Sequence, residues 1–290
     1  MPLQYNNVGN MINVGQYNTL RVVKEVEFGL YLDGGESGEI LLPAKYVPEG
    51  TAVDDEVEVF VYHDSEDRLI ATTEEPYIMV GEFAFLETKM VNRVGAFLDW
   101  GITAKDLLVP FAEQRATMRE GGVYLVYAFL DDMTGRIVAS SKVDKFLDNT
   151  PPEYTVNQAV ELLVVQETEL GYKVIVENRH WGMVYKNEVF TTIEPGDFVT
   201  GYIKKVREDE KLDISLQPVG YQQAVGDGAI AERIMDELQK AGGFLPYGDK
   251  TDADVIVRVF GCSKKNFKKS IGSLYKARRI EITTDGIKVV

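Results

Sequence analysis

Two stretches of this sequence combine side chains that can hold a single-stranded nucleic acid. In the first, between residues 172 and 205, aromatic rings are interleaved with basic groups. Rings stack on unpaired bases, which contributes roughly 1–3 kcal/mol per base, and lysines neutralise phosphates. The alternative is that the rings fill a small core. The candidate contacts here are Tyr172, Lys173, His180, Trp181, Tyr185, Lys186, Lys204 and Lys205.

The second stretch, residues 263–280, has the pattern of a basic helix. At about 100° per residue, Phe267, Ile271 and Leu274 share one arc, and five lysines occupy the opposite arc. Few acidic residues interrupt the basic arc, which favours nucleic-acid contact over a merely solvated face. The alternative is docking onto a protein or onto the acidic part of the chain. The candidate contacts are Lys264, Lys265, Lys268, Lys269, Lys276, Arg278 and Arg279.

Other chemistry is poorly represented in the sequence. His63 and His180 are the only histidines, and neither has cysteine or carboxylate neighbours at metal-ligand spacing. No Gly-rich phosphate loop of the GxxxxGK[ST] type occurs. The acidic runs at 54–56 and 208–210 are interpreted as solvated turns. We therefore expect no metal, no cofactor and no enzymatic activity.

Charge is distributed unevenly over the 290 residues. The formal net charge is −15, but residues 221–290 carry +3 and residues 1–220 carry −18. A mildly basic tail thus follows a strongly acidic body, and such asymmetry is more informative than the total. The single cysteine, Cys262, excludes an internal disulfide and suits a reducing cytoplasm. No apolar run is long enough to span a bilayer, and the polar N-terminus does not have the pattern of a signal peptide.

The elements that position the first stretch form a threefold repeat. A central glycine recurs at Gly29, Gly95 and Gly171, each between two apolar runs. A strand end recurs at Pro43, Pro110 and Asn187, and a final strand begins at Arg68, Arg136 and Lys211. Each copy holds about five short β-branched and aromatic strands joined by Gly, Asp and Pro, which favours a small closed barrel.

In each copy the central glycine is expected to bend a long strand around a barrel corner. If Gly29 forms a bulge, Phe28 and Tyr31 point to the same face. Phe28, Tyr31 and Phe97 are therefore weaker stacking candidates in the first two copies, and core or inter-barrel packing is the favoured interpretation for them.

After residue 220 the pattern changes from strands to helices. Ile230, Ile234 and Leu238 have helical spacing, residues 253–260 form a second helix, and Ser263 caps a third. Two short strands follow, joined through Asp285-Gly286, a hairpin signal. Three helices and a hairpin predict a winged helix whose third helix meets a nucleic acid.

The repeats resemble the S1 motif, the OB-fold RNA-binding repeat of bacterial ribosomal proteins. The resemblance is carried by EFGLYL at Glu27–Leu32, GMVYKNEV at Gly182–Val189, PGDFVTGYIKKV at Pro195–Val206 and KLDISL at Lys211–Leu216. Where S1 members often carry a histidine, this chain has Leu41, Leu108 and Tyr185. The whole layout, ending in SKKNFKKSIGSLYKARRI, resembles the conserved virulence factor B family of bacterial RNA-binding regulators. That family implies cytoplasmic RNA binding and effects on gene expression after transcription.

We therefore expect a mostly β fold with a C-terminal α+β domain: three tandem five-stranded OB-fold barrels and a winged helix. The expected segments are a polar N-terminus (1–14), S1-like domains at 15–77, 78–148 and 149–220, and the winged helix at 221–290. The expected partner is single-stranded RNA, bound by the third barrel and the winged helix, with the first two barrels as spacers or protein-docking surfaces. Two alternatives remain open: an adaptor whose acidic barrels bind a basic protein or ribosomal component, and a winged-helix DNA-binding regulator.

Overall fold

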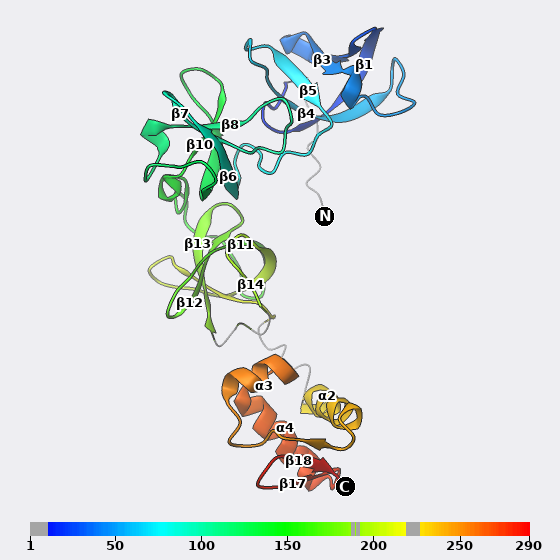
Figure 1. Cartoon of the computed structure of the whole chain (residues 1–290), viewed down its shortest axis with the longest axis vertical. Helices are drawn as coiled ribbons and strands as arrows, with labels where there is room; N and C mark the ends of the chain where they lie inside the picture. Colours follow the sequence, from blue (N-terminus) through cyan, green and yellow to red (C-terminus); the bar gives the residue numbers. More distant parts are fainter. Residues whose placement is uncertain (1–10, 187–188, 190–191, 219–226) are drawn as a thin grey trace. The chain divides into compact units, whose positions relative to one another are not determined.

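The computed structural model describes residues 11–186, 189, 192–218 and 227–290. The chain divides into two compact units, residues 1–147 and 148–290 (Figure 1). The first unit contains two five-stranded sheets, and the second contains a five-stranded barrel and a helical C-terminal region. The predicted fold class, mostly β with three barrel sheets and a winged helix, is confirmed. Asn187 and most of the polar N-terminal segment lie outside the described residues.

Barrel 1 is closed, with strand order β1-β2-β3-β5-β4. On β1, Leu20 and Val22 are buried in the core while Thr19 and Arg21 face solvent. This alternation follows from the two-residue period of a strand. The elements are β1 (Tyr17–Val26), β2 (Gly29–Asp33), η1 (Gly35–Ser37), β3 (Glu39–Pro43), η2 (Ala44–Tyr46), β4 (Glu56–His63) and β5 (Leu69–Thr72).

Barrel 2 repeats this arrangement as a five-stranded sheet of order β10-β9-β6-β7-β8, whose end strands β8 and β10 lie side by side. Its elements are β6 (Phe83–Val91), β7 (Gly95–Leu98), β8 (Leu107–Pro110), η3 (Phe111–Glu113), β9 (Val123–Leu130), β10 (Ile137–Ser140) and η4 (Val143–Phe146).

Barrel 3 is closed, with the same strand order as barrel 1, β11-β12-β13-β15-β14. Its third and fifth strands pair in parallel, as β3 and β5 do in barrel 1. Its strands are β11 (Ala159–Glu167), β12 (Gly171–Val176), β13 (His180–Tyr185), β14 (Phe198–Val206) and β15 (Leu212–Ser215).

The repeated glycine was expected to bend a long strand, but it permits a close contact between strands instead. It starts the second strand of each barrel, and the bulges lie on the first strands instead, at Val22/Lys24 in barrel 1. Gly29, Gly95 and Gly171 have φ of 149°, 158° and 155°. A Cβ at Gly171 would lie 2.0 Å from the Val184 carbonyl oxygen, and the equivalent distances are 2.1 Å at Gly29 and 2.3 Å at Gly95. Glycine is required because the second and third strands approach too closely for any side chain.

The strand register corrects the alignment of the third repeat. Gly29 pairs with Pro43 and Gly95 pairs with Pro110, but Gly171 pairs with Tyr185 and not with Asn187. Tyr185 is therefore equivalent to the two prolines. It follows that Met183, and not Tyr185, occupies the position of Leu41 and Leu108. The shift by two residues keeps every side chain on its predicted face, since the period of a strand is two.

The hydrophobic core of barrel 2 extends onto β4 of barrel 1, whose own core is a separate cluster. Phe60 and Tyr62 of β4 pack edge-on against Trp100, with ring centroids 5.6 and 6.0 Å apart. Trp100 is 1% exposed, and its Nε1 donates a 2.8 Å hydrogen bond to the carbonyl oxygen of Ile78 in the connecting segment. Because these aromatic rings are buried and the indole N–H has a hydrogen-bond partner, the contact between the two barrels, called the joint below, is stable. The two barrels therefore form one packed body.

The C-terminal region is the predicted winged helix. Phe267, Ile271 and Leu274 are buried on one side of the third helix, and the Ser263 side chain caps it by accepting from Asn266 N at 3.2 Å. The sheet order is β16-β18-β17, so the short extended segment adds a third strand to the hairpin. The elements are α2 (Asp227–Lys240), β16 (Phe244–Leu245), α3 (Ala253–Phe260), α4 (Lys264–Lys276), β17 (Ile280–Ile282) and β18 (Ile287–Val289).

The close approach at Gly171 predicts a large effect of one methyl group. Gly171→Ala should destabilise barrel 3 by about 2 kcal/mol or more, because the Val184 backbone cannot move without breaking the β12–β13 ladder. Gly272→Ala is the matched control: it lies in α4 with open space around it and should stabilise the helix by up to about 1 kcal/mol. Denaturant midpoints measure both, and equal midpoints for the two variants would contradict the steric argument.

Candidate nucleic-acid interface

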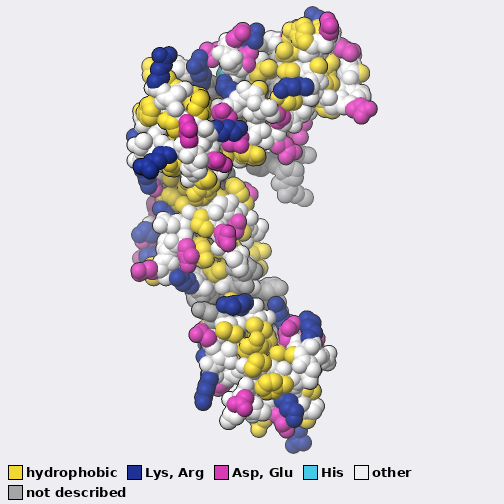
Figure 2. Space-filling model, viewed as in Figure 1, with side chains coloured by type: hydrophobic (Ala, Val, Ile, Leu, Met, Phe, Trp, Pro, Cys, Tyr) yellow, Lys and Arg dark blue, Asp and Glu magenta, His cyan; other side chains and the backbone are white. Residues whose placement is uncertain are grey.

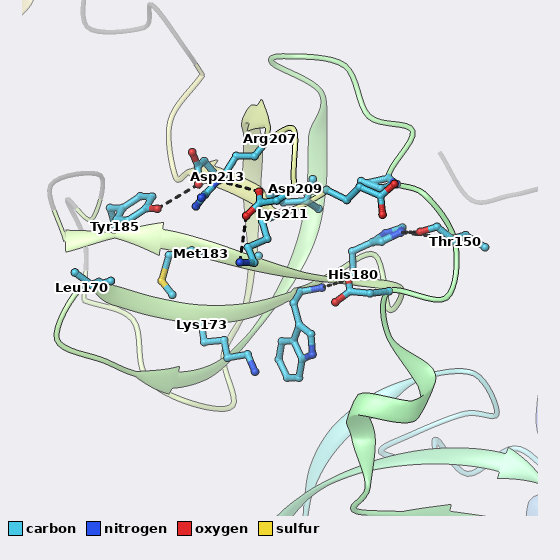
Figure 3. Close-up of a pocket in the computed structure, with 16 residues that line it drawn as sticks. Thr150, Leu170, Lys173, His180, Met183, Tyr185, Arg207, Asp209, Lys211 and Asp213 are labelled. Atoms are coloured by element: carbon cyan, nitrogen blue, oxygen red, sulfur yellow. Dashed lines mark hydrogen bonds and ion pairs between the residues drawn. The ribbon is translucent and has the colours of Figure 1, made fainter.

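A pocket of about 480 Å³ lies on the outer face of barrel 3 (Figure 3). Its floor is formed by the exposed face of β12 and β13, and its rims by the β11–β12 corner and the β14–β15 turn. OB-folds bind oligonucleotides on the corresponding strands and loops. The lining residues are Asp148, Thr150, Pro152, Leu170, Lys173, His180, Trp181, Gly182, Met183, Tyr185, Arg207, Asp209, Glu210, Lys211, Leu212 and Asp213.

Lys173 and Trp181 form the central feature of this pocket. The Lys173 ammonium lies 3.4 Å from the centroid of the indole ring, a cation–π contact. Leu170 at the corner is 67% exposed, and Met183 on β13 is half-buried. The pocket thus offers a ring, two apolar surfaces and a cation at short range, which is the chemistry that single-strand binding uses.

The β14–β15 turn supplies a polar rim of both signs. Asp209 accepts from Arg207 Nε and from Lys211 Nζ, each at 3.1 Å, which holds the pKa of the Asp209 carboxyl below its ordinary value. Asp213 accepts a 3.3 Å hydrogen bond from the Tyr185 hydroxyl. The rim therefore combines hydrogen-bond acceptors with basic groups.

His180 has a structural role that the sequence did not indicate. It is 3% exposed, its Nε2 lies 2.7 Å from the Thr150 carbonyl oxygen, and its Nδ1 lies 2.8 Å from the Tyr154 hydroxyl. The Trp181 amide also donates to Asp148 Oδ1 at 3.0 Å. His180 therefore lines the pocket with both ring nitrogens already engaged, and its ring fastens the segment before β11 to the barrel wall.

The other predicted residues of barrel 3 do not gather in the pocket. Tyr172 packs against the barrel core, because it adjoins Lys173 on the strand and so faces the opposite way, and burial raises the pKa of its hydroxyl. Lys186, Lys204 and Lys205 are exposed but do not line the pocket. Of the predicted set, the pocket brings together Lys173, His180, Trp181 and Tyr185.

Several lining residues were missed by sequence reasoning. The acidic run at 208–210 was interpreted as a solvated turn, yet Asp209 and Glu210 form a rim of the pocket. The signal was available in the repeat, because this turn lies directly before Lys211 and the fifth strand, β15. No sequence signal marked Asp148 and Thr150, which come from the segment that His180 fastens.

The weaker candidates in barrel 1 do share a face. Phe28 and Tyr31 meet edge-to-face with centroids 6.3 Å apart, and Phe28 is 56% exposed. Lys24 Nζ lies 5.6 Å from the Tyr31 ring centroid. In barrel 2 Phe97 is half-buried on β7, beside the exposed Val94 at the corner. The predicted pairing of Phe28 and Tyr31 is thus present, although no bulge at Gly29 produces it.

On the winged helix, the basic residues of α4 other than Lys264 are exposed. Figure 2 shows Lys and Arg side chains at several places on the visible surface of the C-terminal region. Lys264 is half-buried, and Lys268 makes a 3.5 Å ion pair with Asp249. Burial raises the pKa of the Cys262 thiol to about 11, so this cysteine is a packing residue rather than a nucleophile. The exposed basic residues are Lys265, Lys268, Lys269, Lys276, Arg278 and Arg279.

Within the described residues, no cluster of three or more His, Cys, Asp or Glu side chains could hold a metal ion. Among the helices that the structure describes, none is long and apolar enough to cross a membrane.

Comparison with known proteins defines the class of this chain. Residues 14–74 match the S1 domain, and residues 232–289 match the CvfB-like winged helix domain. These families bind nucleic acid rather than catalyse reactions, so the two domains support a nucleic-acid-binding role. The S1 match falls on barrel 1, whereas the aromatic and basic residues of the sequence favour barrel 3.

Full-length relatives point to a particular family. The chain is 28% identical over 94% of its length to Conserved virulence factor B of Staphylococcus aureus (strain USA300), covering 93% of that protein. It is 29% identical over 92% of its length to uncharacterized protein YitL of Bacillus subtilis (strain 168), covering 90%. With the CvfB-like winged helix, these matches confirm the resemblance to the conserved virulence factor B family.

A solved structure from Streptococcus pneumoniae, a multidomain protein with nucleic acid binding domains, covers 96% of this chain and 98% of its own. Its sequence identity is 23% and its TM-score 0.41, a similarity too low to carry a conclusion for this chain.

The two hydrogen bonds of the His180 ring, here called the clasp, are expected to contribute to the free energy of unfolding of barrel 3. His180→Phe keeps a ring but should destabilise barrel 3 by about 1–3 kcal/mol, because the Thr150 carbonyl and the Tyr154 hydroxyl both lose a partner. Tyr154→Phe removes only one of the two bonds and should cost about 1 kcal/mol. Chemical denaturation measures both, and a His180→Phe variant as stable as the parent would show that the ring is not a clasp.

Proposed function

We propose that this protein binds single-stranded RNA through the barrel 3 pocket and the basic face of α4, and acts after transcription as a cytoplasmic regulator of gene expression. In this proposal it is not an enzyme. The observation that carries it is the pair of Lys173 and Trp181 in a pocket on the ligand-binding face of an OB-fold. A ring approached by a cation offers a base a stacking surface and its phosphate a positive charge.

The acidic body is compatible with this proposal. A total charge of −15 repels nucleic acid at long range, so binding depends on the places where basic groups are presented. Near Trp181, Lys173 provides such a group, and Asp209 is already paired with Arg207 and Lys211. The acidic surface would then suppress non-specific binding to duplexes.

One observation favours a second candidate function. Four acidic residues, Asp148, Asp209, Glu210 and Asp213, line the same pocket. A basic peptide segment of a partner protein would also find complementary charge there, as an adaptor requires. The basic residues of α4 are also compatible with a third function, recognition of duplex DNA by the winged helix.

One titration series separates these functions. The full chain is titrated with poly-U, poly-A, a hairpin RNA and duplex DNA, and single-stranded RNA should bind most tightly. Trp181→Ala should lower that affinity about 5- to 150-fold, because the variant cannot stack a base at this position. Phe198→Ala is the matched control, since Phe198 is an exposed ring of the same barrel outside the pocket. No RNA affinity at moderate salt would favour the adaptor, and a preference for duplex DNA would favour the third function.

The contribution of α4 is tested by its salt dependence. Replacing Lys264, Lys265, Lys268 and Lys269 by Glu should weaken RNA binding and reduce the slope of log K against log salt by about 0.7 for each phosphate that is no longer neutralised. As a control, Lys240→Glu changes an exposed lysine of α2 that is paired with Glu237 and should leave the slope unchanged. An unaltered slope in the fourfold variant would remove α4 from the RNA-binding surface.

A further inference from the structure

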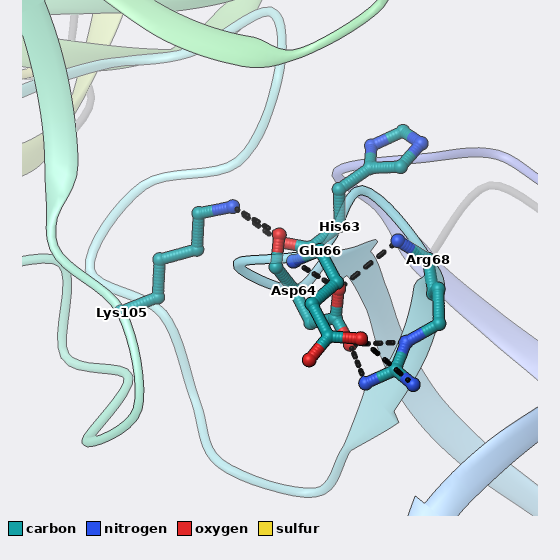
Figure 4. Close-up of polar contacts among 5 residues, drawn as sticks. All are labelled: His63, Asp64, Glu66, Arg68 and Lys105. Carbon is teal, nitrogen blue, oxygen red and sulfur yellow. Dashed lines mark hydrogen bonds and ion pairs between the residues drawn. The ribbon is translucent and has the colours of Figure 1, made fainter.

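Barrel 2 contacts the β4–β5 turn of barrel 1 at two points. Lys105, in the segment between β7 and β8, donates from Nζ to the carbonyl oxygens of His63 and Asp64, the latter at 3.3 Å. Arg136, which directly precedes β10, pairs with Asp67. Figure 4 shows the Lys105 side chain reaching the turn. The joint therefore has a polar part, which consists of this turn and two cations of barrel 2.

The β4–β5 turn is ordered by its own polar contacts, so its charges have a fixed arrangement. Asp64 Oδ1 accepts from the backbone amides of Glu66 at 2.8 Å and Arg68 at 3.0 Å. Asp64 Oδ2 accepts from Arg68 Nε at 2.9 Å, and Arg68 also pairs with Glu66 at 3.1 Å. With Asp67 paired to Arg136, each carboxylate of the turn already has a guanidinium partner.

The charges at this contact cancel while the His63 ring is neutral. The turn contributes three carboxylates and one guanidinium, and barrel 2 adds one ammonium and a second guanidinium. A proton on His63 would change this balance to one excess positive charge. That charge would lie close to the Lys105 ammonium, because the ammonium is bonded to the carbonyl oxygen of the same residue. Like charges repel most strongly where water is partly excluded, and Lys105 is half-buried.

The His63 ring is poorly placed to accept a proton. Its Nδ1 is buried and has no hydrogen-bond partner within the described residues, so an N–H at this atom would be buried and unpaired. Burial lowers the pKa of the imidazole below its ordinary value of 6.5, and the charges of Lys105 and Arg136 lower it further. The carboxylates of Asp64 and Asp67 act on the ring in the opposite direction, but both already have guanidinium partners.

The polar part of the joint is connected to its aromatic part. Tyr62, whose ring packs against Trp100, is the next-to-last residue of β4 and so lies beside the turn. Lys105 lies five residues after Trp100 in the chain. Between them, the Thr103 amide donates to the Glu74 carboxylate of barrel 1 at 3.2 Å. One segment of barrel 2 therefore carries the indole and the ammonium, and a displacement of one is passed to the other.

We propose that the joint is a proton-sensitive switch, which is closed while His63 is neutral and loosens when the His63 ring is protonated. Protonation places a third positive group beside Lys105 and Arg136 and leaves an N–H buried without an acceptor. Loosening would release the segment that holds Trp100 in the core. This switch lies outside the barrel 3 pocket, and it does not depend on the class of ligand that the protein binds.

The sign of the pH dependence follows from the lowered pKa of His63. Well above pH 6.5 the ring is neutral whether the joint is open or closed, so the joint has its full stability. Below pH 6.5 the open form binds the proton more readily, and the ratio of open to closed joint rises by up to about tenfold per pH unit. This increase ends at the lowered pKa of the closed form.

The carboxylates of the turn do not titrate in this range. A hydrogen bond from Arg136 holds the pKa of the Asp67 carboxyl below its ordinary value of 3.8. Burial alone would raise the pKa of the Asp64 carboxyl, but hydrogen bonds from Arg68 bring it below 3.8 as well. A change in the joint just below pH 6.5 is therefore assigned to His63.

Proton NMR of the full chain tests the titration of the ring. His63→Gln identifies the signal, because His180 is the other histidine of the chain. The His63 midpoint should lie below pH 6.5, and Lys105→Met should raise it by removing the ammonium bonded to its carbonyl. Lys142→Met is the matched control, since Lys142 is an exposed lysine of the same barrel that makes none of these contacts. A midpoint of 6.5 or above in the parent, or one that Lys105→Met does not move, would overturn the switch.

Hydrogen exchange of the Trp100 indole N–H tests the opening of the joint, because this group is bonded to the Ile78 carbonyl in the closed form. After correction for the intrinsic pH dependence of exchange, its protection should fall by up to about tenfold per pH unit between pH 6.5 and about pH 5. His63→Gln should abolish this decrease, and His63→Asn is a second variant that does not titrate and should do the same. Protection that is constant in the parent, or that falls equally in both variants, would overturn the proposal.

Discussion

The barrels depend on one close contact, in which the backbone at the start of the second strand lies against the backbone of the third strand. At Gly29, Gly95 and Gly171 the chain passes so close to a carbonyl oxygen of the third strand that no Cβ fits. As a result, the backbone of the residue before the glycine is held in place by a hydrogen bond. The Phe28 carbonyl accepts from Ala44 N at 2.9 Å, and the Leu170 carbonyl accepts from Lys186 N at 3.1 Å. The corner residue of barrels 1 and 3 is thus fixed by backbone geometry, and its side chain can differ between repeats.

The same device recurs outside the barrels. Gly286 in the wing has φ of 159°, and a Cβ there would lie 2.0 Å from the Leu245 carbonyl oxygen. The winged helix therefore orders its hairpin against β16 in the way the barrels order their second and third strands. Two unrelated folds in one chain use a glycine to bring strands into contact.

Much of the fold could be predicted because its signals are local. Recurring glycines, β-branched runs and the change to helical spacing after residue 220 report short-range structure, and the observed strands and helices agree with them. The site was harder because its contacts are long-range. His180 has the sequence surroundings of a binding residue, but its partners lie 26 and 30 residues earlier in a segment without a distinctive pattern. Tyr172 and Lys173 are neighbours in the chain, and only the strand register decides which of them faces the pocket.

The two tryptophans of the chain have different surroundings. Trp100 is 1% exposed in the joint between barrels 1 and 2, and Trp181 is half-buried beside a lysine ammonium in the pocket of barrel 3. The Trp100 indole is shielded from solvent, whereas the Trp181 indole is partly exposed to water. The protein consequently contains its own pair of fluorophores, one in the contact between barrels 1 and 2 and the other in the pocket of barrel 3, and soluble quenchers can distinguish them without any label.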